Sequence, residues 1–386
     1  MEISPAELAE RPAGSYIIYD IRDESDRERG SMPGAAVISV NDLLTQPPCG
    51  REKPIVICCS QGVVSLDIAR ELRSRGYDAY SLEGGYPAWL ADMLSRRDQD
   101  EVRERAEHSI RKKFREPLMH QFVKALKEYK LVNEGDRVAV CISGGKDSML
   151  MAKLFQELKR YSPVNFEVKY LVMDPGYNAR NRKIIEENAR ILGIPITIFE
   201  SDIFASVFNV EKNPCYLCAR MRRGHLYSFA KELGCNKIAL GHHFNDVIET
   251  TVLGMFFGSQ LQAMLPKLHS TNFAGMELIR PLYCIHEDSI IAWRRYNDLE
   301  FIQCACRFTE NCAICDNGGG GSKRQEVKTL LRRLKRDNPN IEKSIFNSIH
   351  AVSLDTMIGY KTHGELHSFL EGYDEKPPVE ESEGEE

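Results

Sequence analysis

A glycine-rich turn, SGGKDS at residues 143–148, constrains the fold of this chain more than any other stretch. It follows the apolar run RVAVCI and precedes the helical pattern MLMAKLFQEL. Gly144 and Gly145 allow the backbone to approach a ligand closely, so that successive N–H groups face an anion at the start of the helix. Lys146 adds a positive charge. We therefore predict a phosphate-binding turn between a buried strand and a helix, with a solvated turn as the alternative.

Strands and helical segments alternate on both sides of this turn. Typical strand patterns are YIIYD, PIVICC and DAYSL in residues 1–97, and RVAVCI, FEVKYLVMD, PITIF and KIALGHH in residues 117–370. This alternation predicts two α/β domains with parallel sheets, in which ligands bind at the carboxyl ends of the strands. Both SGGKDS and GHHFND follow such strands. We expect an exposed helical connector over residues 98–116 and a disordered acidic tail over residues 371–386.

Composition narrows the class of protein. A formal net charge of −5 over 386 residues argues against nucleic-acid binding by the whole surface, but it is compatible with a local basic face. The N-terminus lacks a secretory pattern and no apolar stretch has membrane-spanning length, so we expect a cytoplasmic protein without a membrane partner. Twelve cysteines in such a protein indicate metal binding or thiol chemistry rather than disulfides. GGGGS at residues 318–322 is either a natural flexible loop or an inserted linker.

Six of the twelve cysteines lie in two groups. Cys215 and Cys218 form a Cys-x-x-Cys pair, whose spacing lets both thiolates reach one metal. The second group lies in CACRFTENCAIC and consists of Cys304, Cys306, Cys312 and Cys315. Spacing alone allows structural zinc, an iron–sulfur cluster or a redox dithiol.

SGGKDS resembles the PP-loop of the ATP pyrophosphatases, which cleave ATP between the α and β phosphates and adenylate a carbonyl oxygen. With the stretch from NPCYLCARMRRGH to GHHFNDVIETTVLGMFFG, the chain is similar to the tRNA 2-thiocytidine synthetase family from about residue 110 to residue 370. This resemblance implies a parallel sheet of the adenine nucleotide alpha hydrolase type. It also implies an ATP-dependent tRNA sulfurtransferase that adenylates the C2 oxygen of an anticodon-loop cytidine and replaces that oxygen with sulfur.

The family resemblance also implies roles for individual residues. Lys146 and Asp246 would be catalytic, Asp246 facing Mg²⁺ or phosphate, and Asp174 would lie near the nucleotide. The family usually carries two acidic residues in GHHFND, whereas this chain has Asn245 before Asp246. The residues implied to cradle the ATP phosphates are Ser143, Gly144, Gly145, Lys146, Asp147 and Ser148.

For the cysteines, the resemblance implies a [4Fe–4S] cluster held by three thiolates, with one iron open to carry sulfide. Cys215 and Cys218 match that pattern, and FIQC favours Cys304 as the third ligand. Cys306, and Cys312 in the second Cys-x-x-Cys, are the alternatives for this position, and zinc is the alternative metal.

The first 95 or so residues resemble a rhodanese domain in YDIRDESDRERGSMPGAAVISV, IVICCSQGVVS and YDAYSLEGGYPAWL. The implied nucleophile is Cys59, at the start of a loop that leads into a helix, where backbone N–H groups stabilise a persulfide. Val64 stands where an arginine is common in this loop, and Ser31 and Met32 replace the usual His-Ile. We expect a sulfur relay to the thiolating domain, with an inert module as the alternative.

Basic residues after the first cysteine pair indicate RNA binding. Arg222 and Arg223 lie next to the expected cluster and would contact tRNA phosphates. A cysteine desulfurase would supply sulfur upstream, and a homodimer is a candidate assembly. Two rival functions remain at this point: a PP-loop thiolase acting on a uridine or a small molecule, and a non-catalytic RNA-binding or sulfide-sensing protein.

Overall fold

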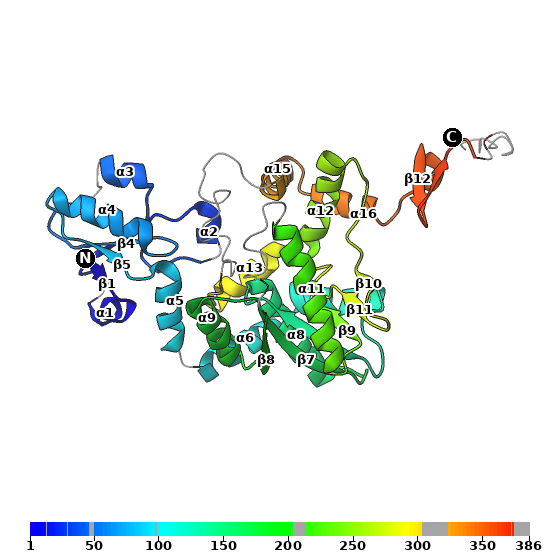
Figure 1. The fold of residues 1–386 in the computed structure, drawn as a ribbon, viewed down its shortest axis with the longest axis horizontal. Coiled ribbons are helices and arrows are strands. Elements are labelled where there is room, and N and C mark those ends of the chain that lie inside the picture. Colours follow the sequence, from blue (N-terminus) through cyan, green and yellow to red (C-terminus); the bar gives the residue numbers. More distant parts are fainter. Residues whose placement is uncertain are drawn as a thin grey trace. The chain divides into compact units, whose positions relative to one another are not determined.

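A computed structural model describes most of the chain, namely residues 1–12, 14–28, 30–45, 50–96, 99–201, 203, 214–302, 323–371 and 373 (Figure 1). The chain divides into two compact units. The first unit consists of Met1–Val247 with Met264–Ser322, and the second of Ile248–Ala263 with Lys323–Glu386. Among the described helices, none is long and apolar enough to cross a membrane.

The first unit begins with a five-stranded sheet of order β1-β5-β4-β2-β3, in which all neighbouring strands are parallel. Its central strand β4 is buried at all four positions, because helices cover both faces of a parallel sheet. The expected strands in YIIYD, PIVICC and DAYSL are therefore confirmed. The strands are β1 (Glu2–Ile3), β2 (Ile17–Asp20), β3 (Ala36–Val37), β4 (Ile55–Cys58) and β5 (Ala79–Leu82). The helices are α1 (Pro5–Glu10), α2 (Glu24–Glu28), α3 (Val40–Thr45), α4 (Val63–Ser74) and α5 (Gly85–Ser95).

A second, six-stranded sheet has the order β10-β11-β9-β6-β7-β8 and is parallel except at β10. Its strands are β6 (Arg137–Ile142), β7 (Glu167–Asp174), β8 (Ile196–Glu200), β9 (Lys237–Ala239), β10 (Lys267–His269) and β11 (Glu277–Ile279). The helices around it are α6 (Gln99–Arg111), the π-helix η1 (Arg115–His120), α7 (Gln121–Glu128), α8 (Lys146–Tyr161), α9 (Ala179–Ile191), α11 (Pro214–Glu232) and α13 (Glu287–Tyr296). A further helix, α12 (Phe244–Gly258), begins in the first unit and continues into the second. The expected α/β class is confirmed in both sheets.

Strand β6 decides where the glycine-rich turn lies. Five of its six residues are buried, and it pairs with β7 on one side and β9 on the other. The turn therefore leaves the carboxyl end of a central strand, as the sequence predicts. GHHFND leaves the carboxyl end of the neighbouring strand β9.

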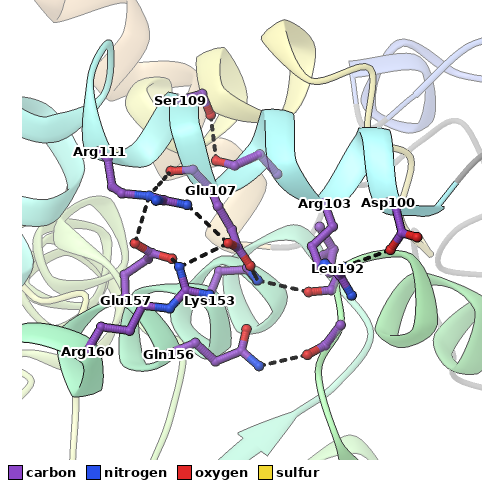
Figure 2. A network of polar contacts seen from close by, with 12 residues as sticks. Asp100, Arg103, Glu107, Ser109, Arg111, Lys153, Gln156, Glu157, Arg160 and Leu192 are labelled. Carbon is purple, nitrogen blue, oxygen red and sulfur yellow. Dashed lines mark hydrogen bonds and ion pairs between the residues drawn. The ribbon is translucent and has the colours of Figure 1, made fainter.

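The connector is helical, as expected, but the expectation that it is exposed is wrong for one face. Ala106 and Ile110 of α6 are 0% exposed. Glu107 of α6 accepts a hydrogen bond of 2.7 Å from Lys153 Nζ of α8, and Lys153 is 1% exposed. Figure 2 shows Arg111 and Arg160 converging on Glu107 and Glu157 around this contact. Charge pairing thus fixes α6 to the helix that begins at the turn.

The second unit contains the C-terminal elements α15 (Lys323–Asp337), α16 (Ile341–Ser348), η3 (Leu354–Thr356), β12 (Gly359–Thr362) and β13 (Glu365–Ser368). The two strands form an antiparallel hairpin. Arg324 Nε of α15 pairs with Glu249 Oε2 of α12 at 2.9 Å within this unit. Of the expected acidic tail, residues 374–386 and 372 lie outside the described residues.

Replacing Lys153 with alanine should lower the free energy of unfolding by roughly 3 kcal/mol, because removing one partner leaves Glu107 buried without its closest cation. The measurement is urea unfolding followed by circular dichroism. The matched control is Arg70→Ala, which removes an exposed pair with Asp67 and should cost less than about 1 kcal/mol. Equal losses in the two variants would contradict a structural role for the buried network.

Candidate functional site

The glycine-rich turn has the geometry of an anion-binding loop. Gly144 has φ +85°, a left-handed conformation that favours glycine. A Cβ added there would also lie 2.5 Å from Ile185 Cγ1 and 2.7 Å from Ile302 Cδ1. Ser143 N donates to Ser148 Oγ at 3.1 Å, and Ser148 Oγ donates to Gly145 O at 3.0 Å. Side chains from other segments therefore pack on the turn, and hydrogen bonds within it stabilise its shape. Gly145 is the N-cap of α8.

Lys146 lies between two carboxylates. Its Nζ is 3.1 Å from Asp147 Oδ1 and 3.2 Å from Glu287 Oε1. Burial lowers the pKa of Lys146, but attraction to Asp147 and Glu287 outweighs this effect, so the net pKa is raised. Lys146 therefore stays cationic at neutral pH, as a phosphate-binding lysine requires.

GHHFND packs against the turn. A Cβ added to Gly241 would lie 3.2 Å from Ser148 N, and His243 Nε2 is 3.9 Å from Asp147 Oδ1. Asp246 Oδ2 accepts a hydrogen bond from His243 N at 3.0 Å, which fixes the carboxylate at the start of α12. The two motifs that the sequence places at neighbouring strand ends are therefore in contact.

Sequence reasoning missed Glu287, the first residue of α13. Its backbone N donates to Asn245 Oδ1 at 2.9 Å, while its carboxylate reaches Lys146. Asn245, which stands where the family usually has an acidic residue, thus positions a carboxylate from another segment. The signal available in the sequence was an acidic residue shortly after the strand ELI at residues 277–279.

Asp174 lies at the carboxyl end of β7 and is 5% exposed. Its Oδ1 accepts hydrogen bonds from Gly176 N at 2.9 Å and Tyr177 N at 2.6 Å, and its Oδ2 is 3.2 Å from Arg182 Nη1. These contacts shape the loop between β7 and α9. Its implied position near the nucleotide stays a prediction.

The expected cluster ligands are only partly described. Cys215 and Cys218 both lie in α11, where positions three apart share one helical face. Cys304, Cys306 and Cys312 lie outside the described residues, as does the GGGGS stretch. In the part of the chain that the structure describes, no group of three or more His, Cys, Asp or Glu residues is arranged to hold a metal.

Arg222 and Arg223 follow the cysteines on α11. Each affects the pKa of a buried residue in the domain that contains the six-stranded sheet, called the nucleotide domain below. Burial raises the pKa of Cys141 in β6 to about 12, and Arg222 partly offsets this rise. Burial lowers the pKa of Arg280 to about 10, and Arg223 lowers it further, whereas Asp246 raises it. Arg223 is exposed and Arg222 is half-buried, so both basic side chains border the same domain as the turn.

Cys59 lies in a second anion-binding loop, between β4 and α4. Its Sγ accepts a hydrogen bond from Gly62 N at 3.0 Å and lies 3.1 Å from Ser65 Oγ, which in turn is 2.9 Å from Ser81 Oγ. Gly62 is the N-cap of α4, so the sulfur lies at the positive end of a helix dipole. Ser65 is a further site residue that sequence reasoning did not single out.

The cysteine beside it has a different environment. Cys58 is 0% exposed in β4, and burial raises its pKa, which favours the neutral thiol. Cys58 is therefore a packing residue of the first sheet. Val64, which replaces the common loop arginine, is 53% exposed, and Met32 is 3% exposed and part of the core.

Comparison with known proteins yields two family models. A PP-loop domain matches residues 114–306 and a rhodanese-like domain matches residues 4–92. The tRNA-cytidine(32) 2-sulfurtransferase of Citrifermentans bemidjiense is 39% identical over 233 residues, covering 59% of this chain and 88% of that protein. The protein of the same name from Polaromonas naphthalenivorans is 32% identical over 282 residues, covering 71% and 85%.

Among solved structures, the U34-tRNA thiolase NcsA from Methanococcus maripaludis with its [4Fe–4S] cluster has a TM-score of 0.48 at 22% identity. That likeness covers 65% of this chain and 83% of NcsA.

Replacing Glu287 with glutamine should strengthen binding of metal-free ATP about threefold, or roughly 0.7 kcal/mol, because it removes a negative charge beside Lys146. The same change should reduce the gain in affinity that Mg²⁺ brings. Titration calorimetry with and without Mg²⁺ measures both effects. Asp288→Asn, one residue further and exposed, is the control and should change neither. An unchanged affinity in Glu287→Gln under both conditions would place Glu287 outside the nucleotide site.

Replacing Ser65 with alanine should slow alkylation of Cys59 by iodoacetamide about fivefold at fixed pH, since a hydroxyl contact to the sulfur is worth about 1 kcal/mol. Peptide mass spectrometry reports the rate at Cys59 alone. Ser60→Ala, whose hydroxyl bonds to Asp26 instead, is the control. If both variants react at the rate of the unmodified chain, Ser65 does not activate Cys59.

Proposed function

Because this chain belongs to the PP-loop family that includes the tRNA-cytidine(32) 2-sulfurtransferases, we propose that it converts cytidine 32 of tRNA to 2-thiocytidine, with its rhodanese-like domain supplying the sulfur. The observation that carries this proposal is the contact between SGGKDS and GHHFND around Lys146, in the same domain as the helix of Cys215 and Cys218. The relatives' name favours cytidine over the uridine and small-molecule alternatives.

The first step activates the base. The C2 oxygen of cytidine attacks the α-phosphorus of ATP, the bond to the β-phosphate oxygen breaks, and pyrophosphate leaves. Backbone N–H groups at the start of α8 and the Lys146 ammonium neutralise the charge that develops on the leaving pyrophosphate. Asp147 and Glu287 hold this ammonium in place.

Magnesium would bind with the nucleotide rather than before it. Mg²⁺ prefers one or two carboxylates together with phosphate oxygens and waters, so a preformed cage of three protein ligands is not needed. Asp246 and Glu287 are the carboxylates at the turn that suit this role, Asp246 being held by His243 N at 3.0 Å. When bound, the cation supplies charge stabilisation to the phosphoryl transfer.

The cysteine set fits an iron–sulfur cluster by the chemistry of its donors, because thiolates are the usual ligands of such clusters and Cys215 and Cys218 occupy positions three apart in α11. Cys215, Cys218 and Cys304 would hold it. When bound, an iron–sulfur cluster would supply iron that can carry sulfide for the reaction.

Sulfur reaches the site through Cys59. The Cys59 thiolate attacks the outer sulfur of a donor such as thiosulfate, a new S–S bond forms, and sulfite leaves. A dithiol then reduces the persulfide: its two electrons cleave the S–S bond, Cys59 regains its thiol, and hydrosulfide is released. The N-terminus of α4 and Ser65 stabilise the anionic sulfur in between. In a cell, a cysteine desulfurase is the proposed upstream donor.

The second step at the base is a displacement. Hydrosulfide attacks C2 of the adenylated cytidine, the C2–O bond breaks, AMP leaves with the former carbonyl oxygen, and the sulfur loses its proton. Arg222 and Arg223 on α11 would hold tRNA phosphates, which makes RNA binding weaken with salt. A local basic helix reconciles RNA binding with the net charge of −5.

The decisive experiment incubates the anaerobic chain with tRNA, ATP, Mg²⁺, thiosulfate and a dithiol, and measures 2-thiocytidine by nucleoside mass spectrometry. Lys146→Ala should reduce the product at least a hundredfold with either sulfur source. Cys59→Ser should fail with thiosulfate but regain activity with added sulfide, because only the relay is lost. Absence of 2-thiocytidine in the unmodified chain with both sulfur sources would refute the proposed function.

A separate measurement addresses the cluster. The anaerobic protein should be brown and should contain close to four irons per chain, and Cys215→Ala should lose both colour and iron. The control is Cys235→Ala, which removes a buried thiol in the turn after α11. This variant should keep both the colour and the iron. A colourless protein with one zinc per chain would contradict the cluster and favour the zinc alternative.

A further inference from the structure

The turn at Gly84–Tyr86 belongs to the Cys59 loop. Tyr86 N donates to Cys59 O at 2.9 Å. A Cβ added to Gly85 would lie 2.4 Å from Cys59 O, and one added to Gly62 would lie 2.8 Å from Gly84 N. The two glycine-rich turns are therefore packed backbone against backbone, and whatever holds Gly84–Tyr86 also holds the Cys59 loop.

The nucleotide domain contacts this turn through α9. Arg180 Nη1 donates to Gly84 O at 3.3 Å, and its guanidinium carbon lies 2.3 Å from where a Cβ on Gly84 would be. The helix α5, which begins at this turn, packs against α9. Five residues further along α9, Ile185 packs on Gly144 of SGGKDS. One helix thus touches both anion-binding loops.

A second segment makes the same connection. Tyr86 Oη donates to Glu300 Oε2 at 3.0 Å, and two residues later Ile302 packs on Gly144. Tyr86 is 2% exposed, with the Arg22 guanidinium 3.7 Å above its ring. Burial and then Glu300 raise the pKa of Tyr86, so its hydroxyl stays protonated and keeps donating at neutral pH.

The two segments that connect the loops, Arg180–Ile185 and Glu300–Ile302, are both short. Five helical residues rise by about 7.5 Å, and two extended residues span at most about 7 Å. Because Arg180–Ile185 and Glu300–Ile302 both end on Gly144, they fix the Gly84–Tyr86 turn close to the nucleotide loop by two independent routes. A rhodanese-like domain on a flexible tether needs neither contact.

We propose that the Tyr86–Glu300 and Arg180–Gly84 contacts position the Cys59 loop so that its sulfur is delivered to the nucleotide domain of the same chain. Tyr86, Glu300 and Arg180 are positioning residues. The inference rests on the proposed relay and adds its route: hydrosulfide cleaved from Cys59 reacts at the base before it equilibrates with solution. A sulfur that is held as the Cys59 persulfide until the dithiol releases it acts at an effective concentration in the millimolar range, far above micromolar free sulfide.

The test is a single-turnover transfer. Cys59 of the full chain is loaded with [³⁵S]thiosulfate labelled in the outer sulfur, excess donor is removed, and tRNA, ATP, Mg²⁺, dithiol and a tenfold excess of unlabelled sulfide are added. We expect the ³⁵S content of 2-thiocytidine to be at least tenfold higher than complete mixing of the released sulfur with the unlabelled sulfide would give. A mixture of loaded Lys146→Ala chains with unloaded Cys59→Ser chains should transfer at least tenfold less.

Variants of the contact test the positioning. Tyr86→Phe keeps the ring on Arg22 but removes the hydroxyl, and should lower labelled transfer several-fold while Cys59 loading and sulfide-driven thiolation stay unchanged. Glu300→Ala should have the same effect, and the double variant should be no worse than either, because both remove one interaction. Tyr77→Phe, another tyrosine beneath an arginine, is the matched control.

Two results would overturn the inference and can be told apart. The same-chain route is overturned, and the relay left intact, by either of two outcomes. In one, the mixed chains form labelled product as fast as the unmodified chain; in the other, Tyr86→Phe transfers label as fast as the unmodified chain. If loaded Cys59 passes no label to tRNA while added sulfide still yields 2-thiocytidine, both the relay and this inference are overturned.

Discussion

The packing of Gly144 underlies the arrangement of both sites. Gly144 has a left-handed backbone conformation just before α8, and Ile185 and Ile302 pack on it from two other segments. A side chain at this position would collide with both isoleucines. The nucleotide loop is therefore shaped by residues about 40 and 160 positions away, and not by the local sequence alone.

Electrostatics around the loop follow from the same packing. Burial lowers the pKa of Lys146, but Asp147 and Glu287 raise it by more, and Asn245 fixes Glu287 through its backbone. The buried network of Glu107 and Lys153 attaches the preceding helix α6 to α8 (Figure 2). A rigid helix with a charged start is suited to hold a polyphosphate without reorganising.

The two isoleucines also connect the sites. Ile185 and Ile302 lie on segments that reach the Cys59 loop through Arg180 and Glu300. The Cys59 loop and the SGGKDS turn are consequently neighbours of the same two segments. For a reaction in which sulfide must meet a short-lived adenylate, this proximity shortens the path and limits loss to water.

Local patterns in the sequence predicted the α/β class, the glycine-rich turn and the strand that precedes it, because each depends on residues close together in the chain. The resemblance to a rhodanese domain, and not a local pattern, gave Cys59 as the nucleophile candidate. Ser65 escaped sequence reasoning because its contact with Cys59, six residues earlier, depends on how the loop turns into α4. Glu287, Arg180 and Glu300 escaped it since each acts on a loop formed by another segment. The supposed exposed connector was misjudged for the same reason: the charges of α6 meet their partners only across the fold. Which distant side chains meet is decided by tertiary packing, because contact between remote segments depends on how the strands order themselves in the sheet.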